Sequence, residues 1–321
     1  MASNLETLVT VFGGSGFLGR NVVRALCRRD YRVRVAVRRP ELAGYLQPSG
    51  KVGQVHTVQA NLRYPASVEA ALRDSHVVIN LVGILAQSGG QTFDAVQARG
   101  AETVAKAAAA AGARLVHVSA IGADAESPSR YAKAKAAGEA AVLAAVPSAT
   151  IFRPSVMFGP EDQFTNRFAA LATISPVLPL IGGETRMQPV YVGDVATAIA
   201  DAVDGKAKAG ATYELGGPEV LTMREIIEAI LAITDRKRAL VPLSFGLARF
   251  QANFLQFAPG ALKLTPDQVT LLEHDNVVSE AAKAAGLTLE GLGIAGDSLE
   301  AIAPQYLWRF RAAGQFQRKS A

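Results

Sequence analysis

The chain has 321 residues, of which 50% are apolar and 7% aromatic, and a chain of this length and apolar content can bury a large core. Its 33 Lys and Arg exceed its 28 Asp and Glu, giving a net charge of +5, but the excess is spread along the sequence and forms no basic block. These features exclude a disordered chain and argue against a dedicated nucleic-acid-binding protein.

Targeting and membrane-spanning segments are not expected. The first apolar stretch begins at Leu8, which leaves no room for a signal peptide or an Arg-rich transit peptide. No apolar run approaches the roughly 20 residues that span a bilayer. The single cysteine, Cys27, cannot form an internal disulfide. We therefore expect a cytoplasmic protein whose association with a membrane, if any, is peripheral.

Short β-branched stretches alternate with Ala-rich stretches through the first half of the chain. This alternation is typical of an α/β fold of the doubly wound Rossmann type, with a parallel sheet and helices on both of its faces. We expect strands over 8–12, 32–37, 55–59, 77–81, 115–119 and 150–153, and helices over 18–29, 66–72, 93–111 and 131–145.

The regular alternation ends after Pro154, where Gly, Pro and Phe become frequent, and it returns over 189–216. We therefore expect a first domain of 1–155 that is rejoined by about 189–216. The segments 156–188 and 217–321 then form a smaller, substrate-type C-terminal domain.

In this smaller domain, Phe250, Phe254 and Phe257 recur at helical spacing. We interpret the stripe as the core-facing side of a helix over 245–257, and docking on a partner or a membrane surface is the alternative.

Three glycines form a G-x-x-G-x-x-G motif between the first strand and the first helix. Gly13 allows a tight turn, Gly16 lets backbone N–H groups approach a pyrophosphate, and Gly19 lets the helix pack closely on the strand. The N-terminus of the following helix supplies further N–H donors and a favourable dipole. The motif in this context predicts that the first domain binds a dinucleotide.

The residues after the second strand indicate which dinucleotide is bound. Proteins that prefer NAD usually carry an acidic residue there for the ribose hydroxyls, and this chain has Arg38 and Arg39 instead. Guanidinium groups pair with a 2′-phosphate through charge-assisted hydrogen bonds. We therefore predict NADP(H) as the cofactor, the alternative being two solvated arginines at a strand end.

Ser119, Tyr131 and Lys135 together match the groups that carbonyl reduction requires. Tyr131 and Lys135 are four residues apart on a predicted helix, so both project from one face, and Ser119 ends the preceding strand. A phenol beside an ammonium can pass a proton to a carbonyl oxygen that a serine hydroxyl holds. A lone Tyr-x-x-x-Lys spacing is common on helix surfaces, but the glycine motif and the serine give it weight as a catalytic set.

The sequence resembles the extended short-chain dehydrogenase/reductase superfamily over nearly its whole length. Within that superfamily it is similar to the dehydrogenase-like accessory subunits of respiratory complex I, NADH:ubiquinone oxidoreductase, in their alphaproteobacterial form. These atypical members hold NADPH in a role that is structural. The resemblance rests on residues 11–20 (VFGGSGFLGR), 33–40 (VRVAVRRP), 77–84 (VVINLVGI), 117–139 with SPSRYAKAKAAGE at its end, and 264–278 (LTPDQVTLLEHDNVV).

The glycine motif and the resemblance together imply a set of cofactor-binding residues. Two positions depart from the pattern of active members: Asn61 stands where an Asp is usual, and Gln97 stands where an Asn commonly organises the proton relay. The second departure puts turnover in doubt. The implied cofactor-binding residues are Gly13, Ser15, Gly16, Phe17, Gly19, Arg38, Arg39, Asn61, Leu62, Leu81, Val82, Gly83, Tyr131, Lys135 and Pro154.

Two functions are consistent with these features. The first is an NADP(H)-holding accessory or assembly subunit of bacterial complex I, with protein partners in that complex, at the cytoplasmic face of the inner membrane. The second is a free NADP-dependent reductase or epimerase that acts on a sugar nucleotide, a quinone or another carbonyl compound. The four histidines show no metal-ligand spacing, so no metal is expected.

Overall fold

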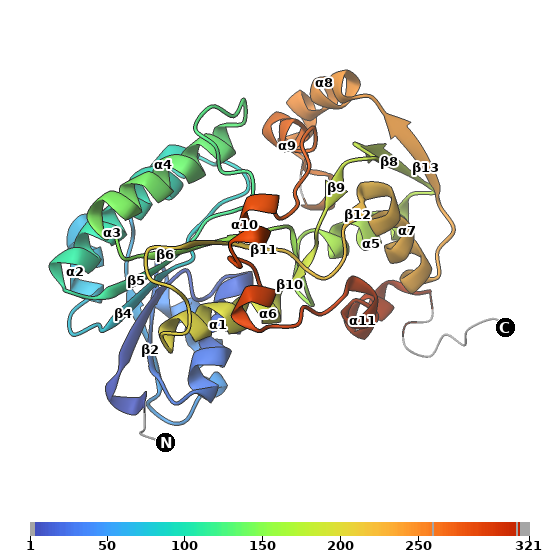
Figure 1. Cartoon of the computed structure of the whole chain (residues 1–321). Coiled ribbons are helices and arrows are strands. Elements are labelled where there is room, and N and C mark those ends of the chain that lie inside the picture. The colour runs from blue at the N-terminus through green and yellow to red at the C-terminus, as the bar shows by residue number, and fades with distance from the viewer. Residues whose placement is uncertain (1–3, 259, 313, 315–321) are drawn as a thin grey trace. The chain divides into compact units, whose positions relative to one another are not determined.

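The structure is a computed structural model that describes residues 4–258, 260–312 and 314 (Figure 1). These residues form two units. Unit 1 contains the described residues up to Pro154, Gly193–Leu215 and Ser279–Ile294. Unit 2 contains Ser155–Val192, Gly216–Val278 and the described residues from Ala295 onward.

A parallel sheet forms the centre of unit 1. Its strand order is β11-β6-β5-β4-β1-β2-β3, and every neighbouring pair is parallel. The order reverses at β1, so the sheet is wound in both directions from this strand and the predicted doubly wound Rossmann fold is confirmed. The strands are β1 (Leu8–Phe12), β2 (Arg32–Val37), β3 (Val55–Gln59), β4 (Val77–Asn80), β5 (Arg114–Val118), β6 (Thr150–Pro154) and β11 (Thr212–Leu215).

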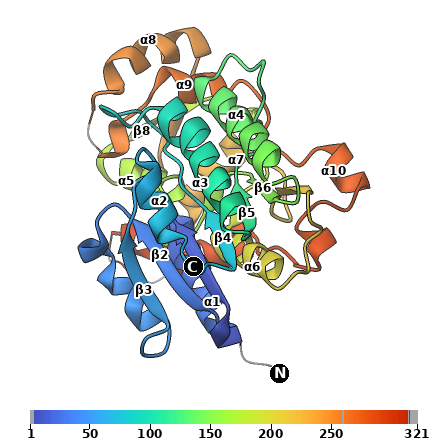
Figure 2. The same cartoon turned by 90° about the vertical axis from the view of Figure 1, so that its left-hand side faces the viewer.

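Helices cover both faces of this sheet. Figure 2 shows α3 and α4 side by side in front of the strands, with α2 next to α3, and Figure 1 shows α1 and α6 on the opposite face. Alanines let α3 and α4 approach the sheet closely, since they bury little volume and lose no rotamer freedom. The bounds are α1 (Phe17–Arg28), α2 (Pro65–Ala71), α3 (Arg99–Ala110), α4 (Arg130–Ala145), α6 (Val192–Val203) and α10 (Glu280–Ala284), with 3-10 segments at Asn4–Glu6, Pro40–Ser49 and Glu290–Leu292.

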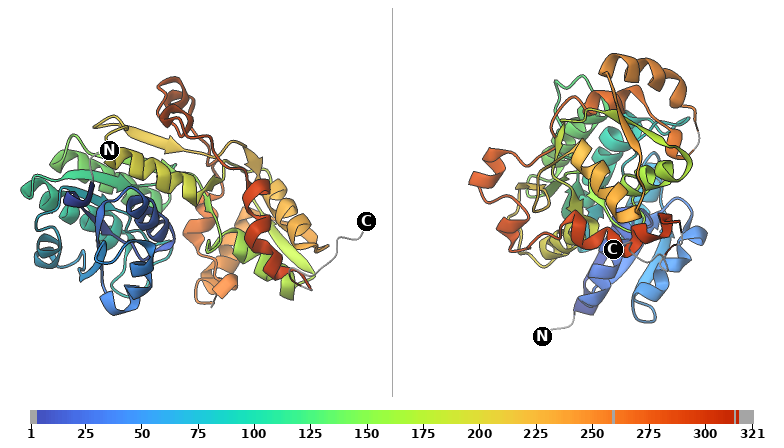
Figure 3. Two further views of the ribbon diagram at one scale, coloured as in Figure 1. Left: turned by 90° about the horizontal axis from the view of Figure 1, so that it is seen from below. Right: turned by 90° about the vertical axis from the view of Figure 1, so that its right-hand side faces the viewer.

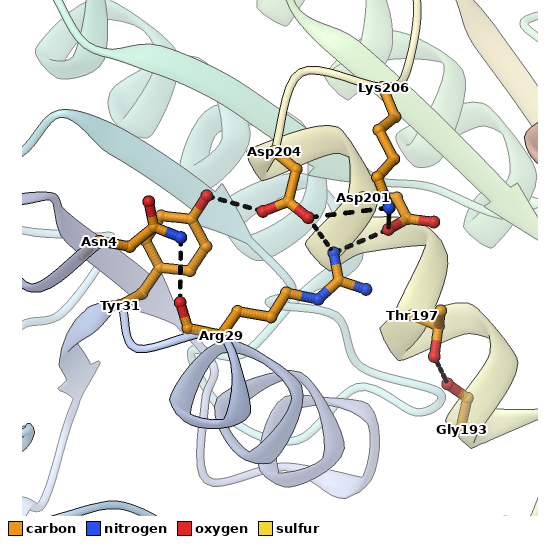
Figure 4. A network of polar contacts seen from close by, with 8 residues as sticks. All are labelled: Asn4, Arg29, Tyr31, Gly193, Thr197, Asp201, Asp204 and Lys206. Atoms are coloured by element: carbon orange, nitrogen blue, oxygen red, sulfur yellow. Dashed lines mark hydrogen bonds and ion pairs between the residues drawn. The ribbon is translucent and has the colours of Figure 1, made fainter. Parts of the chain in front are cut away.

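A polar network joins the end of α1 to α6 (Figure 4). The Arg29 guanidinium lies 2.7 Å from a carboxylate oxygen of Asp201 and 2.6 Å from one of Asp204. Tyr31 donates its hydroxyl to Asp204 over 2.7 Å, and the Lys206 ammonium lies 2.8 Å from Asp201. Because the network links segments more than 160 residues apart in sequence, it fixes α6 to the β1–α1–β2 part of unit 1.

Unit 1 differs from the sequence-based expectations in two places. The helix expected over 93–111 starts with a π-helical turn, Asp94–Ala98, before α3 begins. In addition, 279–294 belongs to unit 1, whereas the sequence grouped it with the smaller domain. The reason is a direct attachment to β11: Ser279 N–H donates to the Glu214 carboxylate over 2.8 Å, and Glu214 N–H donates to the Leu287 carbonyl over 2.9 Å.

Unit 2 consists of short strand pairs and helices around its own core. Figure 3 shows the parallel β8–β13 pair with α5 and α7 beside it. The core combines aliphatic residues of α7 with Phe158, Leu178 and Tyr306. The strands are β7 (Met157–Phe158), β8 (Val177–Ile181), β9 (Arg186–Met187), β10 (Val190–Tyr191), β12 (Leu221–Thr222) and β13 (Ala239–Leu243), and the helices are α5 (Thr165–Ile174), α7 (Met223–Thr234), α8 (Phe245–Leu255), α9 (Pro266–Leu271), α11 (Leu299–Ile302) and α12 (Pro304–Leu307), with 3-10 turns at Gly260–Leu262 and Trp308–Phe310.

The interpretation of Phe250, Phe254 and Phe257 as core residues is wrong. A helix forms where it was expected, as α8, but these three side chains are 63%, 66% and 83% exposed. The core-facing side of α8 instead carries Ala248 and Ala252. No helix in the described part of the chain is sufficiently long and apolar to cross a bilayer.

Candidate nucleotide site

The glycine motif forms a tight turn between β1 and α1. Gly13 has a φ of +80°, a conformation that side-chain-bearing residues rarely adopt, and its carbonyl accepts the N–H of Gly16 over 3.0 Å. A Cβ added at Gly19 would lie 2.2 Å from the Gly13 carbonyl oxygen, so only glycine permits this approach of α1 to the turn. At Gly16 an added Cβ would lie 3.3 Å from the same oxygen, which leaves the position sterically tight but conformationally ordinary.

The start of α1 faces this turn with free backbone donors. Gly16 is the N-cap, and no side chain in the described chain caps the helix there. The first N–H groups of a helix have no partner within the helix, and together with the helix dipole they favour an anion. Ser15 and Phe17, the other predicted contacts in this turn, flank Gly16. The local geometry therefore fits a pyrophosphate.

The carboxyl ends of the neighbouring strands lie around the same turn. A Cβ at Gly13 would lie 3.2 Å from the carbonyl carbon of Leu81 and 3.3 Å from Val82, so the residues after β4 pack directly on the glycine turn. Because all strands are parallel, the other predicted cofactor residues at strand ends share this edge of the sheet. Arg38 and Arg39 follow β2, Asn61 and Leu62 follow β3, Gly83 follows β4, and Pro154 ends β6.

Arg38 and Arg39 are both exposed where the chain leaves β2. Asn61 is half-buried, and its side-chain oxygen accepts the N–H of Arg63 over 3.1 Å. Leu62 is buried beneath α3, next to Gly100. The edge of β2 therefore presents two cations and no acidic side chain at the residues that directly follow the strand.

The segment after β2 is also tied to the glycine turn, through Tyr45, which the sequence did not single out. The Tyr45 hydroxyl donates to the Ser15 carbonyl over 2.7 Å. The Arg20 guanidinium donates to the same carbonyl over 3.3 Å and lies 5.3 Å from the centroid of the Tyr45 ring. These contacts hold the Pro40–Ser49 segment beside the turn.

Ser119 lies at the end of β5, and Tyr131 and Lys135 lie on the first turns of α4. Ser119 directly follows β5 and is buried. The Lys135 ammonium donates to the Val118 carbonyl over 3.1 Å and lies 5.9 Å from the centroid of the Tyr131 ring. The Tyr131 ring packs edge-on against Phe93 at 5.7 Å. Tyr131 and Lys135 are thus neighbours on α4, and Lys135 bonds the end of β5, which Ser119 follows.

Burial changes the acid–base properties of this cluster. Lys135 is fully buried, and the loss of hydration lowers its pKa to about 8, although Glu139 acts in the opposite direction. Burial and the nearby Lys135 ammonium lower the pKa of His117 to about 3. His117 is therefore neutral at physiological pH, and Lys135 can exchange its proton close to that pH.

Four buried polar atoms in this region have no hydrogen-bond partner among the described residues: the amide nitrogen and oxygen of Gln97, the outer ring nitrogen Nε2 of His117 and the hydroxyl of Ser119. Leaving a buried polar group unpaired costs about 1 to 3 kcal/mol, so such atoms usually meet a ligand or water. A Cβ at Gly83 would lie 3.5 Å from Lys135 Nζ and 3.9 Å from Gln97 Nε2, which places both groups beside the same strand end. The residues present therefore fit a polar ligand such as the ribose and nicotinamide of a dinucleotide.

The π-helical turn explains how Gln97 reaches this position. A Cβ at Gly138 of α4 would lie 2.2 Å from the Gln97 carbonyl oxygen, so α4 packs against the widened turn itself. π-turns within helices often occur at functional sites because they redirect one side chain. The sequence had indicated Gln97 only as a departure from the pattern of active enzymes.

His117 and Asn80 belong to the same cluster but were not predicted. Asn80 Nδ2 lies 3.2 Å from His117 Nδ1, and the Asn80 side-chain oxygen accepts the N–H of Val82 over 3.2 Å. Because the Asn80 amide donates, His117 Nδ1 accepts, and the proton of the neutral ring is on Nε2. The available signal was that His117 lies two residues before Ser119, on the same side of β5. Among the described residues, no group of His, Cys, Asp and Glu side chains could hold a metal ion.

Comparison with known proteins places the chain among nucleotide-binding proteins of this fold. A model of the NAD dependent epimerase/dehydratase family matches residues 9–216. The protein named NADH dehydrogenase (ubiquinone) 1 alpha subcomplex subunit 9, mitochondrial, from Arabidopsis thaliana is 36% identical over 320 residues, covering 96% of this chain and 79% of the relative.

Two further similarities involve reductases. A ceramide reductase of Caulobacter vibrioides is 38% identical over 199 residues, which cover 62% of each protein. The crystal structure of the NADPH-dependent quinone oxidoreductase of Escherichia coli, complexed with NADPH, matches with a TM-score of 0.71 at 20% identity, over 94% of this chain and 99% of the oxidoreductase. This last similarity establishes a shared fold.

Proposed function

The chain belongs to the NAD dependent epimerase/dehydratase family, and on this basis we propose that it holds NADP(H) as an accessory or assembly subunit of NADH:ubiquinone oxidoreductase. Its place would be the cytoplasmic face of a bacterial inner membrane, bound to other subunits of that complex. The proposal does not require turnover. It is supported by similarity along 96% of the chain to a plant protein that carries the name of such a subunit.

The observation that carries the cofactor assignment is the pair of exposed arginines after β2. β1 and β2 are parallel neighbours, so Arg38 and Arg39 are at the same sheet edge as the glycine turn. A 2′-phosphate placed there would be neutralised by guanidinium groups, and no acidic side chain at the two positions would repel it. The remaining predicted residues would hold the pyrophosphate, at Gly13–Phe17, and the nicotinamide half, at Leu81–Gly83, Tyr131, Lys135 and Pro154.

A reductase remains the second candidate. It is supported by Lys135, which lies beside Tyr131 and bonds the strand end that Ser119 follows, and by the ceramide reductase among the relatives. Bound NADPH would supply a hydride to a carbonyl compound. Ser119 would hold the carbonyl oxygen, Tyr131 would donate a proton to it, and the Lys135 ammonium beside the phenol would favour that transfer. Gln97 stands where active members commonly place an Asn, and this substitution favours the accessory role over turnover.

One experiment separates the two candidates. The purified chain and its Tyr131→Phe variant are assayed for NADPH oxidation with carbonyl compounds and quinones, and each is also used to recover partners from solubilised membranes. Tyr64→Phe, which changes an exposed tyrosine outside the cluster, is the matched control. The accessory role predicts that both variants retain NADPH and recover the complex.

Turnover above roughly 1 per second, the low end of ordinary enzyme rates, that is lost in Tyr131→Phe and kept in Tyr64→Phe would overturn the accessory role and establish the reductase. Failure to recover subunits of the complex with any form would also contradict the accessory role.

A further inference from the structure

The helix α8 in unit 2 has two apolar sides, and only one of them is covered. Ala248 and Ala252 on one side pack against Val269 of α9. On the other side Leu247, Phe250 and Phe254, together with Phe257 just beyond the helix, follow one another at helical spacing. We call these four residues the aromatic ridge. Figure 1 shows α8 beside α9.

The aromatic ridge is exposed to solvent to an unusual degree. Leu247 is 48% exposed, and the three phenylalanines are between 63% and 83% exposed. Phe250 and Phe254 contact each other edge-on, with ring centroids 5.6 Å apart. Single exposed apolar residues are ordinary, whereas a row of them along one helix marks a surface that is covered in use. Leu262, 51% exposed in the turn after α8, lies in the same stretch of chain.

The charged residues in the segment that carries the aromatic ridge are all cationic. From Ala239 to Pro266 the sequence contains no acidic residue and two cationic ones, Arg249 and Lys263. Arg249 forms an ion pair with Glu273. Lys263 forms no ion pair among the described residues, so its charge is not neutralised. Apart from the Arg249–Glu273 ion pair, the segment that carries the aromatic ridge adds a cation and no acid, which complements an anionic surface with an apolar interior.

We propose that the aromatic ridge docks on the surface of a membrane that contains anionic phospholipid. The phenylalanine rings enter the boundary between headgroups and acyl chains, and Lys263 lies at the level of the phosphates. A bilayer accommodates a protruding row of rings without a matching groove, which a protein partner or a second copy of this chain would have to supply. The proposal goes beyond the cofactor site, because none of its residues belongs to unit 1.

The test measures binding of the purified full chain to vesicles by sedimentation, with phosphatidylcholine alone and with phosphatidylcholine mixed with phosphatidylglycerol. We expect binding that is stronger with phosphatidylglycerol. The double variant Phe250→Ser, Phe254→Ser should bind the mixed vesicles at least about tenfold more weakly, because two rings no longer move from water into the membrane. Lys263→Glu should weaken binding to the mixed vesicles and leave binding to phosphatidylcholine unchanged.

The matched control is the double variant Val52→Ser, Val220→Ser. It removes two apolar side chains, 108% and 47% exposed, that lie outside the aromatic ridge, and it should bind vesicles like the unmutated chain. Thermal unfolding of each variant verifies that the fold is retained. Insertion is read directly from Phe254→Trp, whose added fluorescence should be quenched by brominated acyl chains.

Three results would overturn the proposal: no sedimentation of the unmutated chain with mixed vesicles, equal binding by both double variants, or a Phe254→Trp signal that brominated lipid does not quench. Concentration-dependent dimers that disappear in Phe250→Ser, Phe254→Ser, without vesicle binding, would assign the aromatic ridge to a second copy of the chain instead. If the unmutated chain did not bind NADPH, the expected vesicle binding would be the same. The proposal of membrane docking and the proposal of an NADP(H)-holding subunit can therefore fail separately.

Discussion

Arg38 provides the sharpest test of cofactor choice at the scale of a single residue. Arg38→Ala removes an exposed guanidinium at the end of β2. We expect NADPH affinity to fall by roughly 1 to 2 kcal/mol and NADH affinity to change little, because only NADPH carries the 2′-phosphate. Isothermal titration calorimetry with both cofactors measures the difference.

The matched control for this prediction is Arg32→Ala. Arg32 is exposed at the opposite end of the same strand, away from the carboxyl edge of the sheet. It should leave both affinities unchanged. Equal affinity of the unmutated chain for NADPH and NADH would contradict the assignment of the 2′-phosphate to this strand end.

His117 makes stability depend on pH on the acid side. Its pKa is lowered from about 6.5 to about 3 in the folded chain, so between these values the unfolded chain binds more protons. The free energy of unfolding must therefore rise with pH across this window, by up to about 1.4 kcal/mol per pH unit for one group. Above pH 6.5 the contribution is constant.

In the variant His117→Gln, the free energy of unfolding should rise less steeply with pH on the acid side. The Gln amide can still accept a hydrogen bond from Asn80 but does not titrate. Urea denaturation at intervals from pH 4 to pH 7 provides the measurement. His56→Gln, which changes an exposed histidine, should follow the unmutated chain. An equal pH dependence of the free energy of unfolding in all three proteins would show that His117 does not cause the loss of stability in acid.

The residues of the site differ in whether their contacts lie close together in the sequence or far apart. The proximity of Tyr131 and Lys135 could be predicted, because a spacing of four residues places both on one face of a helix. Asn80 and Tyr45 could not, since their contacts with His117 and Ser15 join positions 37 and 30 residues apart. No periodicity encodes such pairs, which arise only when neighbouring strands and loops are brought together.

At the scale of the element, the glycines in the turn between β1 and α1 have two different roles, which are to leave space for the nucleotide and to let the helix pack on the turn. Gly16→Val should leave the helical circular dichroism signal nearly intact and abolish NADPH binding, because the side chain would occupy the space expected for the pyrophosphate. Gly19→Ala should lower thermal stability even without cofactor, since its Cβ would lie 2.2 Å from a backbone oxygen. Thermal melts of both variants with and without NADPH separate the effects. Retained binding in Gly16→Val would place the nucleotide elsewhere.

The attachment of α6 to α1 depends on Arg29, shown in Figure 4. Arg29→Met leaves the carboxylate of Asp201, 8% exposed, with Lys206 as its cation. We expect a loss of about 1 to 3 kcal/mol in the free energy of unfolding. Lys206→Met, at a side chain that is 60% exposed, should cost less than about 1 kcal/mol. Urea denaturation of both variants tests this order, and a reversed order would contradict it.

Element positions in unit 1 could be predicted well because each strand and helix carries its own periodicity and its own boundary residues. The sides of α8 could not be assigned in this way. Its periodicity correctly predicts a helix, but Ala248 and Phe250 are both apolar, and only packing on α9 decides which side is covered. The widened turn around Gln97 was also missed, and the residue that packs closely on it, Gly138, belongs to a different helix.

At the scale of the whole molecule, cofactor binding should appear as stability. A ligand that binds only the folded chain adds roughly 2.7 kcal/mol when its free concentration is a hundredfold above its dissociation constant. We expect NADPH to raise the unfolding temperature in a concentration-dependent manner and NADH to do so less. Differential scanning calorimetry measures both, with Gly16→Val as the control that should not respond. An unfolding temperature that is insensitive to NADPH would exclude a stabilising role for the cofactor.

The division of unit 1 among three separate stretches of chain has a consequence for synthesis on the ribosome. β6 remains an unpaired sheet edge until β11 has emerged, and Glu214 of β11 obtains its partners Ser279 and Leu287 only later. At 5 to 20 residues per second, synthesis of the chain from Pro154 to Leu215, the end of β11, takes roughly 3 to 12 seconds. An exposed strand edge invites pairing with other chains. The nascent protein should therefore require a chaperone during this interval, and a gene fragment that ends at Pro154 should yield aggregates.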